Sequence, residues 1–281
     1  MKIIEALRAR VPWQRPPQVA VLRLEGVIAP RLRRGAISLS SHAAAIEKAF
    51  ALKGLAAVAL VVNSPGGTPV QAALLFRRIR QLAAEKAVPV FAFAEDVAAS
   101  GGYWLLLAGD EIYSEEASIL GSIGVISASF GFAEMIGRLG IDRRVHTAGD
   151  KKSLLDPFLP EQEGDVERLA LLQRNIHEIF QEEVKRRRAG KIDAADESLF
   201  SGEILTGRMA VAHGLADGIG ELRGVMRARY GEKVRLRPVT PERRRWPRLP
   251  RLPLFGGQSL FPVTDLIDWL EARLLWARFG L

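Results

Sequence analysis

The sequence predicts an α/β protein in which helices cover a mostly parallel sheet. Short apolar runs typical of buried strands alternate with stretches of helical periodicity, and glycine-containing turns separate them. The 281 residues, 48% of them hydrophobic, are enough to bury a substantial core. Because a strand, a helix and a second strand in succession normally form a crossover unit, the alternation predicts repeated βαβ units.

The expected elements follow one another closely along the chain. In the first half they are a strand over 18–28, a helix over 41–53 that stops at Gly54, a strand over 55–62, a turn over 63–67, a helix over 69–85, a strand over 88–94 and a helix over 100–108. In the second half they are short strands over 111–113 and 121–127, a helix near 134–139, a strand over 143–147 and a long helix over about 163–188. No internal repeat is present in the sequence. We therefore expect a basic, proline-rich arm (1–17), a single catalytic domain (18–235), and a C-terminal linker with an amphipathic helix (236–281).

Residue counts exclude several kinds of site and segment. The chain has no cysteine, which rules out disulfides and thiolate chemistry, and its histidines lack the spacing of metal ligands. We expect neither a metal nor a cofactor. The longest uncharged run, 117–133, is interrupted by glycine and serine and is shorter than the roughly 20 apolar residues of a membrane span. The N-terminus has no uncharged apolar core or cleavage site, so no secretory signal is expected and the cytoplasm is the expected location.

Positive charge is concentrated near both ends of the chain. Residues 1–34 and 232–251 each hold eight basic and two acidic residues, so the rest of the chain is slightly acidic although the net charge is +8. This pattern does not fit a nucleic-acid groove, where basic residues alternate with stacking aromatic side chains. A candidate amphipathic helix over 264–279, with Thr264 as its N-cap, follows the second basic segment and suggests peripheral contact with an anionic membrane surface. Packing of this helix on the body or on another subunit is the alternative.

Three glycine-containing turns near strand ends form the candidate chemical site. They lie at 63–67, 98–103 and 120–125. α/β proteins place their sites at such strand ends. The N–H groups of Gly67 and Gly101 could stabilise a developing oxyanion, and Ser100, at the start of its helix, would then be the nucleophile. Taken alone, each turn is more often explained by tight packing.

A nucleophilic serine needs a base, and the histidines are poorly placed for that role. They fall within expected helices, in an expected strand or near a glycine turn, and they are His42, His146, His177 and His213. A lysine whose ammonium is desolvated is another known base. Lys151 and Lys152 lie in an expected strand-end loop, and spacing alone does not distinguish them. Two adjacent lysines are by themselves typical of a solvated turn.

Four motifs in a fixed order resemble the signal peptide peptidase A family of serine peptidases. They are Asn63-Ser64-Pro65-Gly66-Gly67, Ala99-Ser100-Gly101-Gly102-Tyr103-Trp104, Gly121-Ser122-Ile123-Gly124-Val125 and Lys152-Ser153-Leu154-Leu155-Asp156-Pro157-Phe158. A later stretch over 200–220 is similar to the family's closing segment, so the resemblance covers roughly 18–230. It implies the ClpP/crotonase superfold, which agrees with the βαβ pattern.

The resemblance also implies a catalytic dyad. Ser100 matches the family's nucleophile, and Lys152, rather than Lys151, matches the general base because it stands five residues before Pro157. Ser122 matches the serine that hydrogen-bonds this lysine. The implied activity is a serine endopeptidase that hydrolyses unfolded or membrane-derived peptides, such as signal-peptide remnants, without a cofactor.

The remaining expectations concern the oxyanion loop and the partners. By resemblance, the oxyanion donors are Gly67 and Gly101, in a loop shaped by Asn63, Pro65 and Gly66. Single-copy relatives assemble into rings, so we expect a homo-oligomer. The chain resembles a short form without the membrane anchor that family members often carry. Two alternatives remain: a crotonase-type acyl-CoA enzyme, which would not need Ser100 and Lys152 together, and a non-catalytic oligomeric scaffold.

Overall fold

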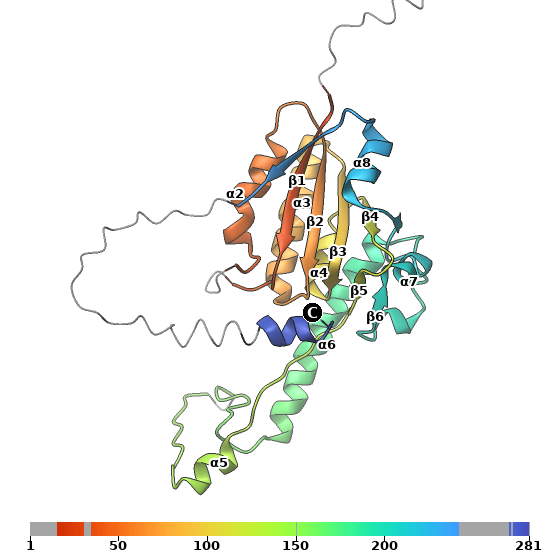
Figure 1. Ribbon diagram of the computed structural model, residues 1–281. Helices are drawn as coiled ribbons and strands as arrows, with labels where there is room; N and C mark the ends of the chain where they lie inside the picture. The colour runs from red at the N-terminus through yellow and green to blue at the C-terminus, as the bar shows by residue number, and fades with distance from the viewer. Residues whose placement is uncertain (1–15, 31–34, 150, 242–269, 271, 281) are drawn as a thin grey trace, which may run out of the picture.

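The fold is known from a computed structural model that describes residues 16–30, 35–149, 151–241, 270 and 272–280. Within these residues one sheet of eight strands runs in the order β6-β5-β3-β2-β1-β8, with β4 pairing with β3 and β7. All its pairings are parallel except that of β5 with β6. The predicted α/β class with a mostly parallel sheet is confirmed (Figure 1).

Helices and strands alternate through the first half of the chain, as expected. The strands are β1 (Gln18–Glu25), β2 (Leu55–Ser64), β3 (Val90–Ala99), β4 (Glu111–Ser114), β5 (Ile119–Gly121), β6 (Ile204–Thr206), β7 (Gly218–Ile219) and β8 (Arg235–Val239). The helices are α2 (Leu39–Phe50), α3 (Pro69–Lys86), α4 (Gly101–Leu106), α5 (Ala133–Arg138), α6 (Glu163–Arg187), the short 3₁₀ helix η1 (Glu197–Phe200), α7 (Gly207–Ala212) and α8 (Leu222–Tyr230).

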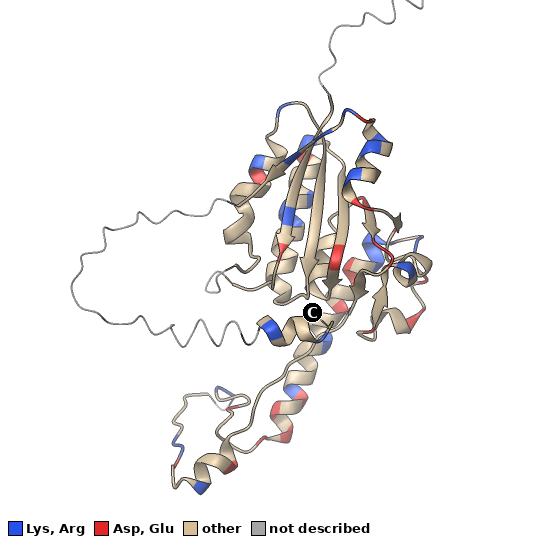
Figure 2. Cartoon of the chain, viewed as in Figure 1, with Lys and Arg blue, Asp and Glu red and all other residues tan. Residues whose placement is uncertain are grey.

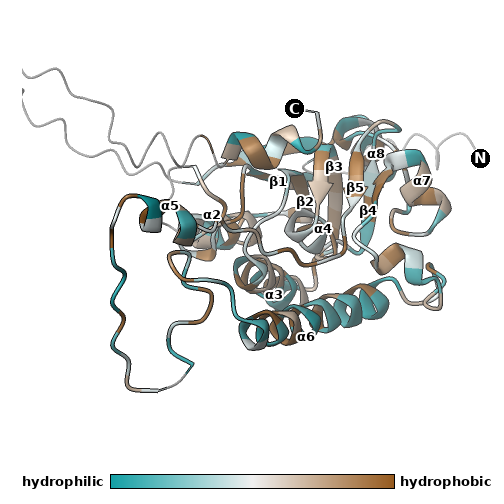
Figure 3. Ribbon diagram, turned by 90° about the horizontal axis from the view of Figure 1, so that it is seen from below, coloured by the Kyte–Doolittle hydropathy of each residue, from teal (hydrophilic) through white to brown (hydrophobic). Residues whose placement is uncertain are grey.

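Two apolar layers pack against the sheet. On one face, α2, α3, α4 and α6 contribute buried side chains such as Ile46 and Phe180 to the larger core cluster. On the other face, α8 contributes Met226 to a smaller cluster with Phe91. The two sets of helices lie on opposite sides of the strands (Figure 3). Charged residues lie mainly on the helix surfaces and near strand ends (Figure 2). β2 has no charged residue and β3 has only Glu95 and Asp96, which is typical of parallel strands covered on both faces.

Two expected strands are wrong. The strand expected over 121–127 is replaced by β5, which ends at Gly121. Gly121 and Ser122 have φ values of 90° and 50°, which turn the backbone out of the extended region. Residues 143–147 form no strand, and in the described part of the chain they pair with no other segment. The last strand, β8, lies at the domain boundary expected near Arg235.

Between β5 and α6 the chain leaves the sheet and forms a long excursion, here called the projection (residues 125–162). Helix α5 lies at the tip of the projection, far from the sheet (Figure 1). The first half of α6 extends alongside it. Several large apolar side chains of the projection are exposed to solvent, namely Ile126, Phe130, Met135, Leu139 and Ile141.

The end of the chain returns to the body. Residues 272–277 are helical, and Ala272 and Leu275 pack against Val27, Ala29 and Ala36. This contact agrees with the alternative in which the C-terminal helix packs on the body. More than half of the first basic segment, half of the second and the expected N-cap Thr264 lie outside the described residues. In the described part of the chain, the helices are all too short or too polar to cross a membrane.

Candidate active site

The candidate nucleophile, Ser100, sits at the sharp turn between β3 and α4. Its backbone has φ 52° and ψ −119°, a conformation that residues with a Cβ rarely adopt. Two hydrogen bonds hold it there: the Ser100 N–H donates to the Gly121 carbonyl at 2.8 Å, and the Ser100 carbonyl accepts from the Trp104 N–H at 3.1 Å. Ser100 is half-buried. Strained backbone at a strand-to-helix turn is characteristic of functional residues, because the surrounding structure must stabilise it.

The loop after β2 lies directly against this turn. A Cβ placed on Gly66 would come within 2.9 Å of the Ser100 Cβ, and one placed on Gly67 would come within 2.0 Å of the Ile28 carbonyl oxygen. Gly66 and Gly67 also have φ values of 102° and 138°. Only glycine allows both the close approach and this backbone conformation.

Two backbone N–H groups lie close together near Ser100. A Cβ placed on Gly101 would lie 3.4 Å from the Gly67 nitrogen, so the two residues are neighbours in space. Among the described residues, neither the Gly67 N–H nor the Gly101 N–H donates a hydrogen bond. Gly101 begins α4, whose first turn has unpaired N–H groups. Two free donors beside a serine hydroxyl can stabilise an oxyanion.

Asn63 and Pro65 belong to the same loop. The Asn63 amide donates to an Asp96 carboxylate oxygen at 2.7 Å, and its side-chain oxygen accepts from the Val97 N–H at 3.2 Å. The Asn63 carbonyl accepts from the Gly26 N–H at 2.9 Å. Asn63 thus connects the end of β2 to its two neighbours in the sheet, β1 and β3. Pro65 is buried.

Ser122 follows the end of β5, beside the same turn. β5 pairs in parallel with β3, with Gly121 opposite Ala99, so Ser122 leaves the sheet next to Ser100. Its N–H donates to the Glu203 carbonyl at 2.7 Å. The structure therefore brings together Ser100, Ser122 and the loop over 63–67.

The two candidate lysines lie apart from this group. Lys151 and Lys152 occupy an exposed turn of the projection, and among the described contacts neither side chain bonds to Ser100. The Lys152 N–H donates to the Gly149 carbonyl at 3.2 Å, a contact within the turn. A single copy of the chain does not bring Lys152 to Ser100.

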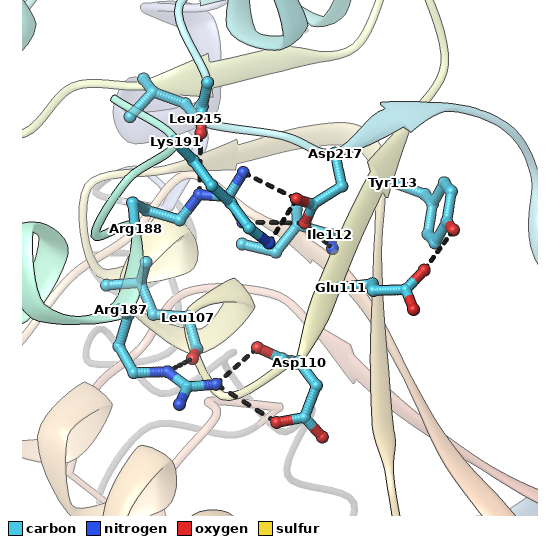
Figure 4. Close-up of polar contacts among 12 residues, drawn as sticks. Leu107, Asp110, Glu111, Ile112, Tyr113, Arg187, Arg188, Lys191, Leu215 and Asp217 are labelled. Atoms are coloured by element: carbon cyan, nitrogen blue, oxygen red, sulfur yellow. Dashed lines mark hydrogen bonds and ion pairs between the residues drawn. The ribbon is translucent and has the colours of Figure 1, made fainter. Parts of the chain in front are cut away.

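Helix α6 packs against α4, the helix that begins beside Ser100, and this role was not predicted from the sequence. The Phe180 ring stacks on Trp104 of α4 at 4.6 Å between centroids and 7° between planes. Arg187 donates to the Leu107 carbonyl at 2.8 Å and to the Gly109 carbonyl at 2.7 Å, just beyond the end of α4 (Figure 4). Periodicity predicted the helix, but it carries no information about which turn of α6 meets α4.

An ion pair with a buried arginine also fixes the end of α6. Arg188 is 2% exposed and donates to both oxygens of Asp217, which also accepts from Lys191 and from the Ile112 N–H (Figure 4). Burial acts to raise the pKa of Asp217, but the hydrogen bonds from Arg188, Lys191 and Ile112 outweigh it and hold that pKa below its ordinary value.

A cavity lies on the other side of Asn63, toward α8. It measures about 750 Å³, and charged side chains line much of it, including Arg23, Glu95, Asp96 and Glu221. Ser100 and Gly67 do not line it. This cavity is therefore separate from the group formed by Ser100 and the two N–H groups.

Comparison with known proteins points to a peptidase family. Residues 82–234 match the sequence model described as Peptidase family S49. The chain is 32% identical over 216 residues to the chloroplastic serine protease SPPA of Arabidopsis thaliana, covering 73% of this chain and 31% of that protein. It is 34% identical over 177 residues to a putative protease of Methanocaldococcus jannaschii, covering 62% of this chain and 54% of that protein.

One similar protein has a different name. The chain is 48% identical over 274 residues to a protein of Brucella abortus (strain 2308) named Na(+)/H(+) antiporter NhaA, covering 94% of this chain but 37% of that protein. Overall, the chain spans about a third of the length of the first curated relatives that it matches. Their names therefore describe proteins much longer than the matched region.

Among solved structures, a mutant of the 1510-N membrane-bound stomatin-specific protease is similar. The TM-score is 0.48 at 14% sequence identity, and the match covers 81% of this chain and 100% of that chain.

Proposed function

Because the chain belongs to peptidase family S49, we propose that it is a serine endopeptidase with Ser100 as nucleophile and Lys152 as general base. The observation that carries the proposal is the strained backbone of Ser100 beside the two free N–H groups of Gly67 and Gly101. A crotonase-type acyl-CoA enzyme would use the two donors but would not need a serine in this conformation. A scaffold protein would need neither.

In the proposed reaction the Ser100 hydroxyl attacks the carbonyl carbon of the scissile peptide bond. Its proton passes to the Lys152 amine, and the carbonyl oxygen becomes an oxyanion that accepts hydrogen bonds from Gly67 and Gly101. When the tetrahedral intermediate collapses, the C–N bond breaks and the Lys152 ammonium returns the proton to the leaving amine. Water then attacks the acyl carbon while Lys152 accepts its proton, the bond from that carbon to the Ser100 oxygen breaks, and Lys152 returns the proton to this oxygen to regenerate Ser100. Ser122 is proposed to accept a hydrogen bond from Lys152 and so orient it.

Lys152 must reach a serine, and we propose that it reaches the Ser100 of a neighbouring copy of the chain. The exposed apolar side chains of the projection favour contact with another protein surface, and a second copy is the partner that supplies a matching site. Burial between copies would also exclude water from the lysine, which is the condition under which a lysine acts as a base. A closed ring of such copies would admit extended or unfolded chains rather than folded proteins.

The proposed substrates are unfolded or membrane-derived peptides, such as remnants of signal peptides. The proposed location is the cytoplasm.

Peripheral contact with an anionic membrane is also proposed, because Leu270 and Leu274 of the C-terminal helix are exposed. Sedimentation with anionic and with neutral vesicles at low salt tests this contact; equal sedimentation with both would argue against it. The antiporter name contributes nothing to the proposal, because the match covers 37% of that protein.

The test of the proposed function compares the wild type with Ser100→Ala, Lys152→Ala and Lys151→Ala. Cleavage of an unfolded casein-type substrate and labelling by a serine-reactive phosphonate are measured for each. We expect Ser100→Ala to lose both, Lys152→Ala to lose cleavage by at least about 10³-fold, and the matched control Lys151→Ala to keep both. The result that would overturn the proposal is a folded wild type that neither cleaves casein nor reacts with the phosphonate. If CoA thioesters then bind this protein and protect it, the acyl-CoA enzyme replaces the peptidase as the proposed function.

A further inference from the structure

One histidine of α6 contacts the backbone beside the proposed active site. His177 is half-buried, and its Nε2 lies 3.1 Å from the carbonyl oxygen of Ile123, 54 residues earlier in the chain. A carbonyl oxygen only accepts, so Nε2 carries the proton and donates it. Ile123 immediately follows Ser122 and is 0% exposed, so its carbonyl needs a partner from within the protein.

A second residue of α6 also contacts this imidazole. The Gln181 side-chain nitrogen, one helical turn away, lies 3.3 Å from Nδ1 of His177 and 3.1 Å from its Nε2. With the proton on Nε2 donated to the Ile123 carbonyl, Nδ1 is the ring nitrogen that can accept from the Gln181 amide. His177 therefore presents one donor toward the segment that carries Ser122.

Hydrogen bonds hold three consecutive residues of this segment. The Gly121 carbonyl accepts from the Ser100 N–H at 2.8 Å, the Ser122 N–H donates to the Glu203 carbonyl at 2.7 Å, and the Ile123 carbonyl accepts from His177. Ser122 has a φ of 50°, which costs energy for a residue with a Cβ, so it persists only if its neighbours are fixed on both sides. The bond at Gly121 connects the same segment to Ser100.

We propose that His177 is a positioning residue for the Ser100 site, because its Nε2–H fixes the Ile123 carbonyl and thereby the strained backbone of Ser122 and Gly121. This inference rests on the proposed function. His177 touches neither a substrate nor the reacting atoms. It acts through the backbone that orients the Ser122 hydroxyl and through the hydrogen bond from Gly121 to the nucleophile.

The effect should be on turnover rather than on substrate binding. The segment 121–123 supports the groups that change charge during the reaction, and misplacing such groups by about 1 Å can cost on the order of 10²-fold in rate. Removing the donor should therefore lower kcat. The backbone of the oxyanion loop at 63–67 has its own hydrogen bonds, so KM should change little.

The experiment compares His177→Leu, which removes the donor, with His177→Gln, whose amide can supply an N–H at a similar reach. His213→Leu is the matched control, since His213 is the C-cap of α7 and its Nδ1 lies 3.8 Å from a carboxylate oxygen of Asp196. We expect His177→Leu to lower kcat by about 10- to 100-fold with KM within about twofold, and His177→Gln to recover most of the loss. Phosphonate labelling of Ser100 should slow in parallel, while His213→Leu should match the wild type.

A readout independent of catalysis accompanies the kinetics. In a Ser100→Ala background, hydrogen exchange of the peptide over 119–124 should be faster with His177→Leu than with His177 or His177→Gln, at an unchanged melting temperature. The inference is overturned if a folded His177→Leu variant keeps the wild-type kcat, if His177→Gln is as impaired as His177→Leu, or if exchange over 119–124 does not change. An inactive, unlabelled wild type would instead refute the proposed function, and the exchange data would still show whether His177 fixes the segment.

Discussion

At the scale of single residues, the site depends on one strained serine held between glycines. Ser100 keeps a positive φ because the hydrogen bonds to Gly121 and from Trp104 fix both of its sides and because Gly66 leaves room for its Cβ. Such strain lowers the stability of the folded protein, and favourable interactions in the surrounding structure offset it. The structure of Ser100 therefore predicts a conflict between stability and activity.

Replacing Ser100 by glycine should stabilise the protein while abolishing activity. Glycine adopts this backbone region without steric cost, which should relieve about 1–3 kcal/mol of strain against about 0.5–1 kcal/mol of additional chain entropy in the unfolded state. We expect Ser100→Gly to raise the melting temperature by about 2–4 °C. Differential scanning calorimetry measures the shift.

Ser100→Ala is the matched control, because it removes the hydroxyl but keeps the Cβ and therefore the strain. Its melting temperature should stay near that of the wild type. Equal melting temperatures for the glycine and alanine variants would show that Ser100 is not strained.

The sequence was informative about this site at the residue scale, with one exception. The paired glycines near Ser100 indicated close approach of two backbones, and Gly66 and Gly67 do lie in tight contact with Ser100 and Ile28. His177 could not be found in this way, because nothing in the helical pattern of α6 reveals that one imidazole meets a carbonyl 54 residues earlier. Contacts between side chains and distant backbone depend on packing rather than on local pattern.

At the scale of elements, α6 joins the projection to the sheet. Its second half is anchored through Phe180, Arg187 and Arg188, whereas its first half extends beside the projection (Figure 1). In the ion pair of this anchor, the side chain of Arg188 is 2% exposed and that of Asp217 is 17% exposed. Breaking it tests how much the anchor contributes to stability.

Asp217→Asn should destabilise the protein by about 3 kcal/mol near pH 7, since it leaves the guanidinium of Arg188 buried without a counter-charge. The folded-state pKa of Asp217 lies below its unfolded value, so the stabilisation is fully present above the unfolded pKa and is lost as pH falls through the folded one. The difference in unfolding free energy between wild type and Asp217→Asn should therefore be largest at neutral pH and shrink below about pH 4. Urea unfolding at several pH values measures this, and a difference independent of pH would contradict it.

Long periodic elements were predictable, and so were the short elements β4, α4 and α5, whereas the strands expected over 121–127 and 143–147 are wrong. The helix expected over 163–188 is α6, and the strands around β2 and β3 were recognised from continuous apolar runs. The run over 121–127 looks like a strand because Ile123 and Val125 alternate with small residues, yet two consecutive positive φ values end β5 at Gly121. β8 contains Pro238 and two arginines and pairs only with β1, so its pattern is that of an edge strand, which is weak in sequence.

At the scale of the whole molecule, the proposed dyad is divided between two parts of the chain. Ser100 belongs to the sheet, and Lys152 belongs to an exposed turn of the projection. The motif order in the sequence predicts a site around Ser100, but it carries no information about whether Lys152 meets the serine of its own chain or of another. That question concerns assembly, which a single chain does not determine.

Mixing two inactive variants distinguishes these arrangements. Ser100→Ala keeps Lys152, and Lys152→Ala keeps Ser100, so a ring assembled from both contains some contacts in which an intact serine meets an intact lysine from the next copy. With random assembly from equal amounts, about a quarter of the contacts are intact, so activity should return to about a quarter of the wild-type value. The two variants are dissociated together, reassembled and assayed on unfolded casein, and Ser100→Ala reassembled with the Ser100→Ala/Lys152→Ala double variant is the control without any intact site. Because a dyad within one chain cannot be restored by mixing, a reassembled but inactive mixture would place Lys152 and Ser100 of the same copy together and require the projection to fold back onto its own sheet.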